Sequence, residues 1–273
     1  MDGTLTAGQL SELIDLVKKV YGFDFSYYSK ASFKRRLSRV MGLKKLEFYD
    51  LKHVLINNHN FFQEFLEEIT VNVTEMFRDP AFYKAVQNQV LPYLSTYQHI
   101  KMWSAGCSSG EEVYSLAILM NETGLKSKSF IYGTDINTEM LKEARKGIYS
   151  LRKIKGYAEN YQLSGLKGSI TDHFTMLYDA AAIHSELKQN TLFSVHNLIS
   201  DTIFNEFQFI SCRNVLIYFE TELQNKILDL FYNSLCPYGF LCLGSKETIR
   251  SDKFKKKFKV INSKENIYQK IGS

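Results

Sequence analysis

His99-Ile100-Lys101-Met102-Trp103-Ser104-Ala105-Gly106 opens the stretch that decides the fold. Residues 99–103 are predicted to form a strand, and small residues as far as Gly110 form a turn. Glu111-Glu112 begins an amphipathic helix, and a second strand ends on Thr134-Asp135. Strand, glycine turn, helix, strand and acid are typical of a nucleoside cofactor site at the carboxyl edge of a parallel sheet, where the acid holds ribose hydroxyls.

The two carboxylates at the helix start restrict the ligand. A phosphate binds a helix start through free N–H groups and the positive end of the dipole, so Glu111 and Glu112 would repel it. A nucleoside without phosphate, preferably a cationic one, fits better, and S-adenosylmethionine carries both sulfonium and ammonium groups. The alternative is that both glutamates only complement the helix dipole and Gly110 only permits the turn, because this glycine spacing is a weak motif.

The N-terminal part, residues 1–70, is predicted to be a small all-helical domain of four helices. Thr6 can cap the first helix and Gly22 can close it. On the second helix, Arg35 and Arg39 lie opposite the apolar stripe, with Arg36 beside them. The residues spaced for the inward faces are Leu10, Leu13, Ile14, Val17, Phe33, Leu37, Val40, Met41, Phe48, Leu51, Leu55, Phe62, Phe65, Leu66 and Ile69.

A linker of residues 71–80 leads into a second domain, residues 81–273. Val71 to Phe77 is predicted to be extended, and Asp79-Pro80 supplies a cap and first-turn proline for a helix to about Tyr93. Farther on, Asn137 caps a helix that Gly147 closes. Residues 150–170 look polar and irregular. The apolar runs within residues 172–195 are too close together for crossover helices, so we expect a small antiparallel β insertion there.

The remaining elements alternate between strand and helix. Phe207 to Ser211 is predicted to be a central strand, Thr221 to cap a helix to about Leu235, and residues 240–243 to form the next strand after a Pro237-Tyr238-Gly239 turn. Residues 260–268 are predicted to finish the sheet as an antiparallel hairpin. This alternation predicts a doubly wound α/β sheet.

Composition and residue spacing argue against a membrane, secreted, disulfide-bonded or metal-binding protein. The 273 residues are 45% hydrophobic, enough for one large core and a smaller one, and no apolar run is long enough to span a bilayer. The N-terminus lacks the features of a signal peptide, so we expect a cytoplasmic protein without membrane insertion. The four cysteines show no C-x-x-C pairing and the six histidines no ligand spacing, so we expect neither disulfide nor metal. The formal charge of +5 lies mainly in residues 30–45 and 253–259, which favours an acidic partner surface or a solvated face over nucleic acid.

Longer strings resemble a known family. In order, they are Asn72 to Pro80, Trp103-Ser104-Ala105 with Gly110 to Ser115, Thr134-Asp135-Ile136, Asn197-Leu198, and the highly specific run Cys212 to Phe219. Together they resemble the CheR family, the S-adenosylmethionine-dependent methyltransferases that esterify glutamates of bacterial chemoreceptors. The resemblance covers about residue 10 to the C-terminus. This chain departs from the family pattern at Met76, Val113 and Gln208, which affects fine positioning only.

The resemblance implies roles for particular residues. Arg78 and Tyr218 would lie nearest the transferred methyl group, where Arg78 could orient the incoming carboxylate and Tyr218 could donate to it or pack against the methyl. The residues implied along the cofactor are Asn72, Thr74, Arg78, Glu112, Asp135, Asn197, Leu198, Arg213 and Asn214. Taken singly, each has an ordinary structural alternative, such as Asn197 as a turn former. Their occurrence together favours the site.

The implied reaction needs little chemistry from the protein. A glutamate side chain has an unperturbed pKa of about 4.3, so it is already a nucleophilic carboxylate at neutral pH and needs no general base. The products are a methyl ester and S-adenosylhomocysteine. We expect a monomer that uses Arg35, Arg36 and Arg39 to contact the acidic side of the receptor's cytoplasmic helical bundle. The competing hypotheses are a methyltransferase with another acceptor and a non-catalytic cofactor-sensing scaffold.

Overall fold

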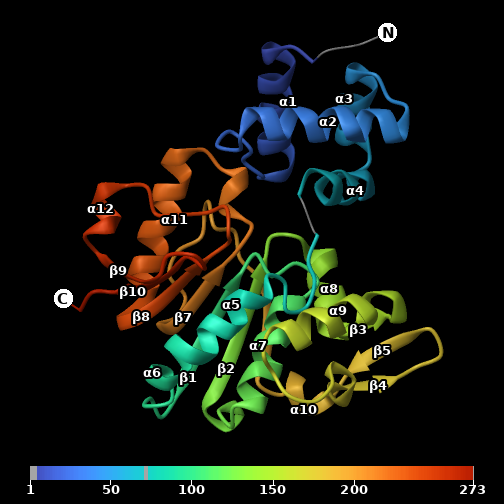
Figure 1. The fold of residues 1–273 in the computed structure, drawn as a ribbon. Coiled ribbons are helices and arrows are strands. Elements are labelled where there is room, and N and C mark those ends of the chain that lie inside the picture. The colour runs from blue at the N-terminus through green and yellow to red at the C-terminus, as the bar shows by residue number, and fades with distance from the viewer. Residues whose placement is uncertain (1–4, 71–72, 273) are drawn as a thin grey trace. The chain divides into compact units, whose positions relative to one another are not determined.

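The computed structural model describes residues 5–70 and 73–272, and the chain divides into two compact units. The first unit contains the N-terminal 72 residues with Tyr218–Lys226, and the second contains Val73–Ile217 with Ile227–Ser273. Figure 1 shows helices α1 to α4 in the first unit and the central sheet in the second. No helix within the described residues is long and apolar enough to cross a membrane.

The first unit contains the four predicted helices. They are α1 (Ala7–Tyr21), α2 (Lys30–Lys44), α3 (Phe48–Asn57) and α4 (His59–Ile69). Thr6 caps α1 in a capping box with Gln9, and Gly22 closes it with a left-handed φ of 74°, as predicted. Nearly all of the predicted inward residues are buried. Ile14 and Met41 are only partly buried against this core.

A segment from late in the chain joins this first unit. Phe219 forms an antiparallel bridge with Tyr28, and the Ser29 N–H donates to the Tyr218 carbonyl at 2.8 Å. The Glu220 N–H likewise donates to the carbonyl of Tyr27 at 2.9 Å. Residues 218–226 therefore pack with the N-terminal helices, an arrangement that the sequence did not indicate.

The second unit is built on a seven-stranded sheet in the order β6-β2-β1-β7-β8-β10-β9. The strands are β1 (Ile100–Ala105), β2 (Ser129–Asp135), β6 (Thr191–Val195), β7 (Phe207–Cys212), β8 (Leu235–Leu243), β9 (Phe258–Asn262) and β10 (Ile267–Lys270). The first five run parallel, and β10 is antiparallel to both β8 and β9, as the hairpin prediction required. The doubly wound α/β fold is confirmed. Tyr238, predicted in a turn, instead lies within β8 with φ 63°.

The helices of this unit follow the predicted pattern with local differences. They are α5 (Pro80–Ala85), η1 (Val86–Val90), α6 (Leu91–Leu94), α7 (Glu111–Glu122), η2 (Lys126–Lys128), α8 (Thr138–Lys146), α9 (Leu151–Leu163), η3 (Ile170–His173), α10 (Ser185–Lys188), η4 (Leu216–Tyr218), α11 (Thr221–Ser234) and α12 (Asp252–Lys255). The end of η4 and the first part of α11 belong to the first unit. The η1 stretch is a π-helix that ends two residues before Pro92, and this proline lacks an N–H for regular α-helical bonding. Asn137 caps α8 and Gly147 closes it, as predicted.

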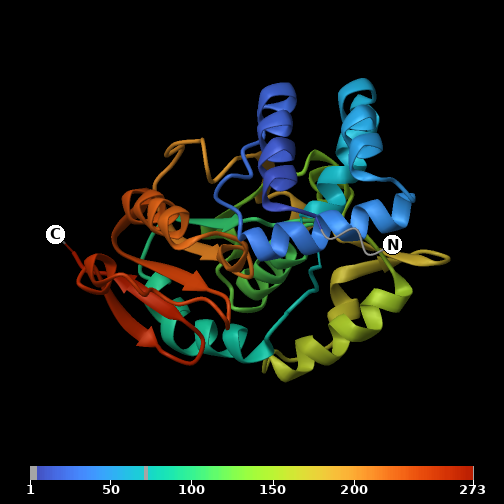
Figure 2. The same ribbon diagram turned by 90° about the horizontal axis from the view of Figure 1, so that it is seen from above.

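The β insertion differs from its predicted bounds of 172–195. The small antiparallel sheet has the order β3-β5-β4, from β3 (Ile148–Ser150), β5 (Ala180–Ile183) and β4 (Phe174–Met176). Residues Thr191–Val195 instead form β6, which pairs parallel with β2 at the edge of the main sheet. The β4–β5 hairpin projects from the second unit in both ribbon views (Figures 1 and 2). The small antiparallel sheet is confirmed, but its bounds differ from those predicted because a short apolar run does not reveal its pairing partner.

The region expected to be irregular contains a 13-residue helix, α9. Its buried residues Ile154, Tyr157 and Tyr161 have helical spacing, but two of the three are tyrosines, which made the segment look polar. The Tyr157 hydroxyl and the Lys153 ammonium each donate to Glu111 at 3.0 Å. Glu111 is fully buried and also accepts from Ser109 at 2.7 Å. Helix α9 is therefore fastened to the start of α7.

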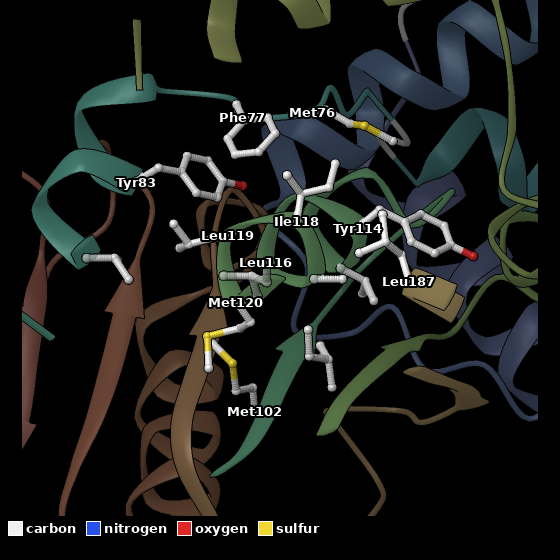
Figure 3. Packing of buried hydrophobic residues seen from close by; sticks show 14 of the residues in the cluster. Met76, Phe77, Tyr83, Met102, Tyr114, Leu116, Ile118, Leu119, Met120 and Leu187 are labelled. Atoms are coloured by element: carbon white, nitrogen blue, oxygen red, sulfur yellow. The ribbon is translucent and has the colours of Figure 1, made fainter. Parts of the chain in front are cut away.

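One large cluster of the second unit's core lies on the face of the central sheet that α7 covers. Figure 3 shows Tyr83, Met102, Leu116 and Ile118 among the side chains that fill it. Nine of the twelve residues of α7 are buried, which explains its mostly apolar sequence. This packing fixes the first turn of α7 at the carboxyl edge of the sheet.

We predict that Tyr157→Phe lowers the free energy of unfolding by about 1–2 kcal/mol, because a buried carboxylate loses one donor. Urea denaturation measures the change. Tyr178→Phe is the matched control, since Tyr178 is fully exposed at the hairpin tip and its change should stay within about 0.5 kcal/mol. Equal effects at both positions would show that the bond from Tyr157 to Glu111 contributes nothing.

Candidate cofactor site

The candidate site lies where the sheet order reverses. The chain runs from β1 outward through β2 to β6 and then returns to β7 on the other side of β1. In open parallel sheets, ligands bind in the crevice at the carboxyl ends of the strands beside such a reversal. The predicted site residues that follow β2, β6 and β7 therefore gather at one edge.

The turn after β1 is built from left-handed glycines. Gly106 and Gly110 have φ values of 77° and 88°, which L side chains rarely adopt. The N–H groups of Gly106 and Cys107 donate to the Thr134 carbonyl at 2.8 and 2.9 Å, which holds the turn against the end of β2. A Cβ on Gly106 would lie 2.5 Å from the Val215 side chain. The turn thus requires glycine for both conformation and space.

Asp135 ends β2 and joins this turn to the next loop. One carboxylate oxygen accepts the Ser108 N–H at 2.8 Å and the other accepts the Asn137 N–H at 2.9 Å. Burial raises the pKa of Asp135, while the N–H donors work in the opposite direction. Each carboxylate oxygen has two acceptor positions, so capacity remains for ribose hydroxyls. Asp135 therefore also supports the fold, which the sequence did not indicate.

Arg213 connects three segments of the edge. Its guanidinium donates to Asp79 at 2.7 Å, to the Arg78 carbonyl at 3.2 Å and to Glu112 at 3.4 Å. It also lies 3.9 Å from the centre of the Phe82 ring. Burial opposes the charge, but Glu112 and the other neighbouring acidic groups raise the pKa of Arg213 above its ordinary value. Asp79 precedes α5 as predicted, but it makes no side-chain cap because its carboxylate binds Arg213.

Glu112 lies in the first turn of α7, next to the carboxyl end of β1. One oxygen accepts from Ser104 at 2.8 Å and the other contacts Arg213, and 16% of the side chain stays exposed. Its predicted contact with the charged methionine part of the cofactor stays a prediction.

The linker places Arg78 beside Arg213. Arg78 is half-buried, and its guanidinium donates to the Val73 carbonyl at 2.9 Å. Phe77, with φ 53°, anchors this turn through a 2.9 Å bond from its N–H to Ser115. Thr74 is half-buried on the same linker, and Asn72 lies outside the described residues.

Asn197 and Leu198 follow β6 at the same edge. The Asn197 side chain accepts the Ile199 N–H at 2.9 Å and so shapes a turn, and Leu198 is buried. His196, interpreted as structural from the sequence, packs edge-on against Trp103 at 5.3 Å between ring centroids. The contact of Asn197 and Leu198 with adenosine stays a prediction.

Asn214 lies in the loop after β7 and is bound by Glu247, a residue that the sequence did not indicate. Asn214 has φ 63°, and its N–H donates to the buried Glu247 carboxylate at 2.8 Å. Glu247 comes from the loop after β8, and a Gly-Ser-Lys-Glu run after a buried strand was its only signal.

The remaining predicted residues lie in the first unit. Tyr218 is half-buried there, so its predicted pairing with Arg78 stays a prediction. On α2, Arg35 is exposed, Arg36 is half-buried, and Arg39 pairs with Glu68 at 3.2 Å. The stripe predicted opposite the apolar face is present, with Arg39 partly engaged.

The edge fits a cationic nucleoside. Glu112 and Asp135 supply negative charge, and the buried Asn137 Nδ2 and Arg213 Nε have no hydrogen-bond partner among the residues described. Such polar atoms usually find a partner in a protein or its ligand. No group of three or more His, Cys, Asp or Glu in this part of the chain could hold a metal ion.

Comparison with known proteins agrees with this geometry. The model of the CheR methyltransferase SAM-binding domain matches residues 72–267, and that of the CheR all-alpha domain matches residues 8–70. A Pseudomonas putida protein named putative methyltransferase Cher3 is 42% identical over 259 residues, 94% of this chain and 95% of the relative. Chemotaxis protein methyltransferases of Borreliella burgdorferi and Listeria innocua are 31% and 33% identical. They cover 91% and 86% of this chain, and 91% and 87% of their own lengths.

The two family models together match nearly the whole chain, and the matched parts correspond to the helical domain and to the sheet with its cofactor edge. This chain therefore belongs to the CheR methyltransferase family, and its cofactor is S-adenosylmethionine.

Proposed function

We propose that this enzyme transfers a methyl group from S-adenosylmethionine to glutamate side chains of chemoreceptors during chemotactic adaptation. The observation that supports a carboxylate acceptor most is that the Arg78 guanidinium binds only a backbone carbonyl among the described residues. Among the described residues no carboxylate pairs with it, although the neighbouring Arg213 has two. A half-buried guanidinium beside the cofactor edge is suited to bind a substrate carboxylate in a bidentate way. Two of the relatives are named chemotaxis protein methyltransferases.

The proposed mechanism rests on alignment. When bound, S-adenosylmethionine supplies a methyl group already activated by its sulfonium. Arg78 would hold the ionised glutamate so that one oxygen points at this methyl, and Tyr218 would donate to the carboxylate or pack the methyl. Holding reactants in line contributes roughly 7–11 kcal/mol. Asn72, Thr74, Glu112, Asp135, Asn197, Leu198, Arg213 and Asn214 would bind the cofactor.

The proposed partner is the cytoplasmic helical bundle of the receptors. The acidic face that carries the methylated glutamates would meet Arg35, Arg36 and Arg39 on α2. We propose that the enzyme works as a cytoplasmic monomer at this bundle.

Labelled S-adenosylmethionine tests the proposed acceptor. Incubation with membranes of the host should label a receptor-sized band, and mild base should release the label as methanol, because methyl esters hydrolyse readily. An Arg78→Ala protein is the control for enzyme-dependent labelling. Base-stable label, or label on nucleic acid or small molecules, would assign a different acceptor.

We predict that Glu112→Gln weakens binding of S-adenosylhomocysteine by about 1.5–3 kcal/mol, the cost of a lost bond to a charged group. Asp135→Ala should weaken binding similarly and also lower the melting temperature, because the N–H groups of Ser108 and Asn137 lose their acceptor. Calorimetric titration and thermal unfolding measure the two effects. Unchanged affinity in both variants would contradict the placement of the cofactor.

We predict that Arg78→Ala and Tyr218→Phe lower kcat more than they lower affinity for the cofactor. Both side chains are proposed to act at the methyl end, and contacts made mainly in the transition state appear in kcat. Steady-state kinetics with receptor, together with titration of S-adenosylhomocysteine, separates the two quantities. Full turnover by Arg78→Ala would remove this residue from the mechanism.

We predict that the double variant Arg35→Glu, Arg39→Glu fails to methylate receptor yet binds cofactor normally. The matched control is Lys18→Glu, Lys19→Glu on α1, where one lysine pairs with Asp24 and the other is exposed. Attraction between the arginines and an acidic bundle should also weaken as salt rises, since the Debye length is about 8 Å at physiological ionic strength. Equal methylation by both double variants would make the stripe an ordinary solvated face.

A further inference from the structure

A buried carboxylate, Glu247, lies between the loops that follow β7 and β8. One of its oxygens accepts the N–H groups of Asn214 and Gly244 at 2.8 and 2.6 Å. The other oxygen accepts the Ile217 N–H at 3.2 Å. Glu247 is only 4% exposed, so water contributes little to holding these groups. One side chain therefore fixes two loops at the carboxyl edge of the sheet.

The loop after β7 has the form of an anion-binding nest. Asn214 is left-handed, and the N–H groups of Asn214 and Ile217 converge on one carboxylate. Successive N–H groups around a left-handed residue form a concave site that prefers an anion. Here the anion is the Glu247 side chain. The loop conformation thus depends on an acceptor that comes from another part of the chain.

Only glycine fits at position 244, because Glu247 and Asn214 leave no room for a side chain. A Cβ on Gly244 would lie 2.5 Å from a Glu247 oxygen and 2.7 Å from the Asn214 nitrogen. Both contacts are shorter than folded proteins allow, so any side chain would push the carboxylate and the loop apart. The Asn266 side chain also donates to the Gly244 carbonyl at 2.9 Å, which holds this backbone in place.

We propose that Glu247 is a positioning residue for methyl transfer. Its carboxylate fixes the backbone of residues 214–217 and so orients Arg213 and Asn214 toward the cofactor. It also sets the point from which the chain continues to Tyr218. This inference rests on the proposed roles of those three residues. A carboxylate that merely joined β7 to β8 would affect stability without affecting cofactor binding or turnover.

Glu247→Gln tests the proposal with almost no change in shape. Whichever way the amide turns, its NH₂ group replaces an acceptor and faces at least one backbone N–H. We expect a folded protein whose Kd for S-adenosylhomocysteine rises about tenfold, because the displaced loop would cost the cofactor a bond to Arg213 or Asn214. We expect kcat at saturating substrates to fall by about 10- to 100-fold, because small misplacements of reacting groups have effects of that size.

Asp172→Asn is the matched control. Asp172 also accepts a backbone N–H, that of Ser169 at 3.0 Å, in the turn before β4. This substitution should leave Kd and kcat unchanged even where the melting temperature falls. Gly244→Ala is the second test variant, because it keeps the carboxylate but displaces it, and it should change Kd and kcat in the same direction as Glu247→Gln.

Wild-type Kd and kcat in either folded test variant, whatever its melting temperature, would overturn the proposal. Loss of the fold in both variants would also overturn it, since Glu247 would then be a purely structural residue. If only Gly244→Ala folds, its Kd and kcat decide. Failure of the proposed function is a separate outcome, because it would appear as absent receptor methylation by the wild-type enzyme.

Discussion

The buried guanidinium of Arg213 is the interaction on which the cofactor edge depends. It joins the loop after β7 to the first turn of α7 through Glu112 and to the linker through Asp79 and the Arg78 carbonyl. A charge this deeply buried is tolerated only when it is paired and hydrogen-bonded. Removing one partner typically costs 3–5 kcal/mol, because the other charge is left uncompensated. The three segments are therefore held in one arrangement before any ligand arrives.

This arrangement explains how the edge suits its cofactor. The partly exposed Glu112 carboxylate lies at the start of α7 and favours a ligand with positive charge, whereas Glu111 is buried against α9. Asp79 and Glu112 neutralise Arg213, while Arg78 keeps its charge available for an anion. The proposed reaction between a sulfonium and a carboxylate would place the cationic cofactor beside Glu112 and the anionic acceptor beside Arg78. Such a reaction needs alignment more than proton transfer.

The sequence predicted the features that depend on neighbouring residues in the chain. The caps at Thr6 and Gly22, the inward faces of the first four helices and the layout from β1 to Asp135 follow from spacing and capping preferences. The predictions from sequence were wrong where residues distant in the chain determine the local structure. Helix α9 is held by buried tyrosines, and β6 pairs with the main sheet because of tertiary context. The role of Glu247 appears only when two loops meet, and the packing of residues 218–226 with the first unit had no local signal.

A crystal structure of the chain with S-adenosylhomocysteine bound tests most directly whether the edge around Arg213 is the working site. We expect the ribose hydroxyls within hydrogen-bond distance of Asp135 and the amino-acid part beside Glu112. The Arg213 contacts to Asp79 and Glu112 should remain as they are in the ligand-free chain. A ligand bound elsewhere on the sheet, or one whose binding separates Arg213 from both carboxylates, would contradict this account.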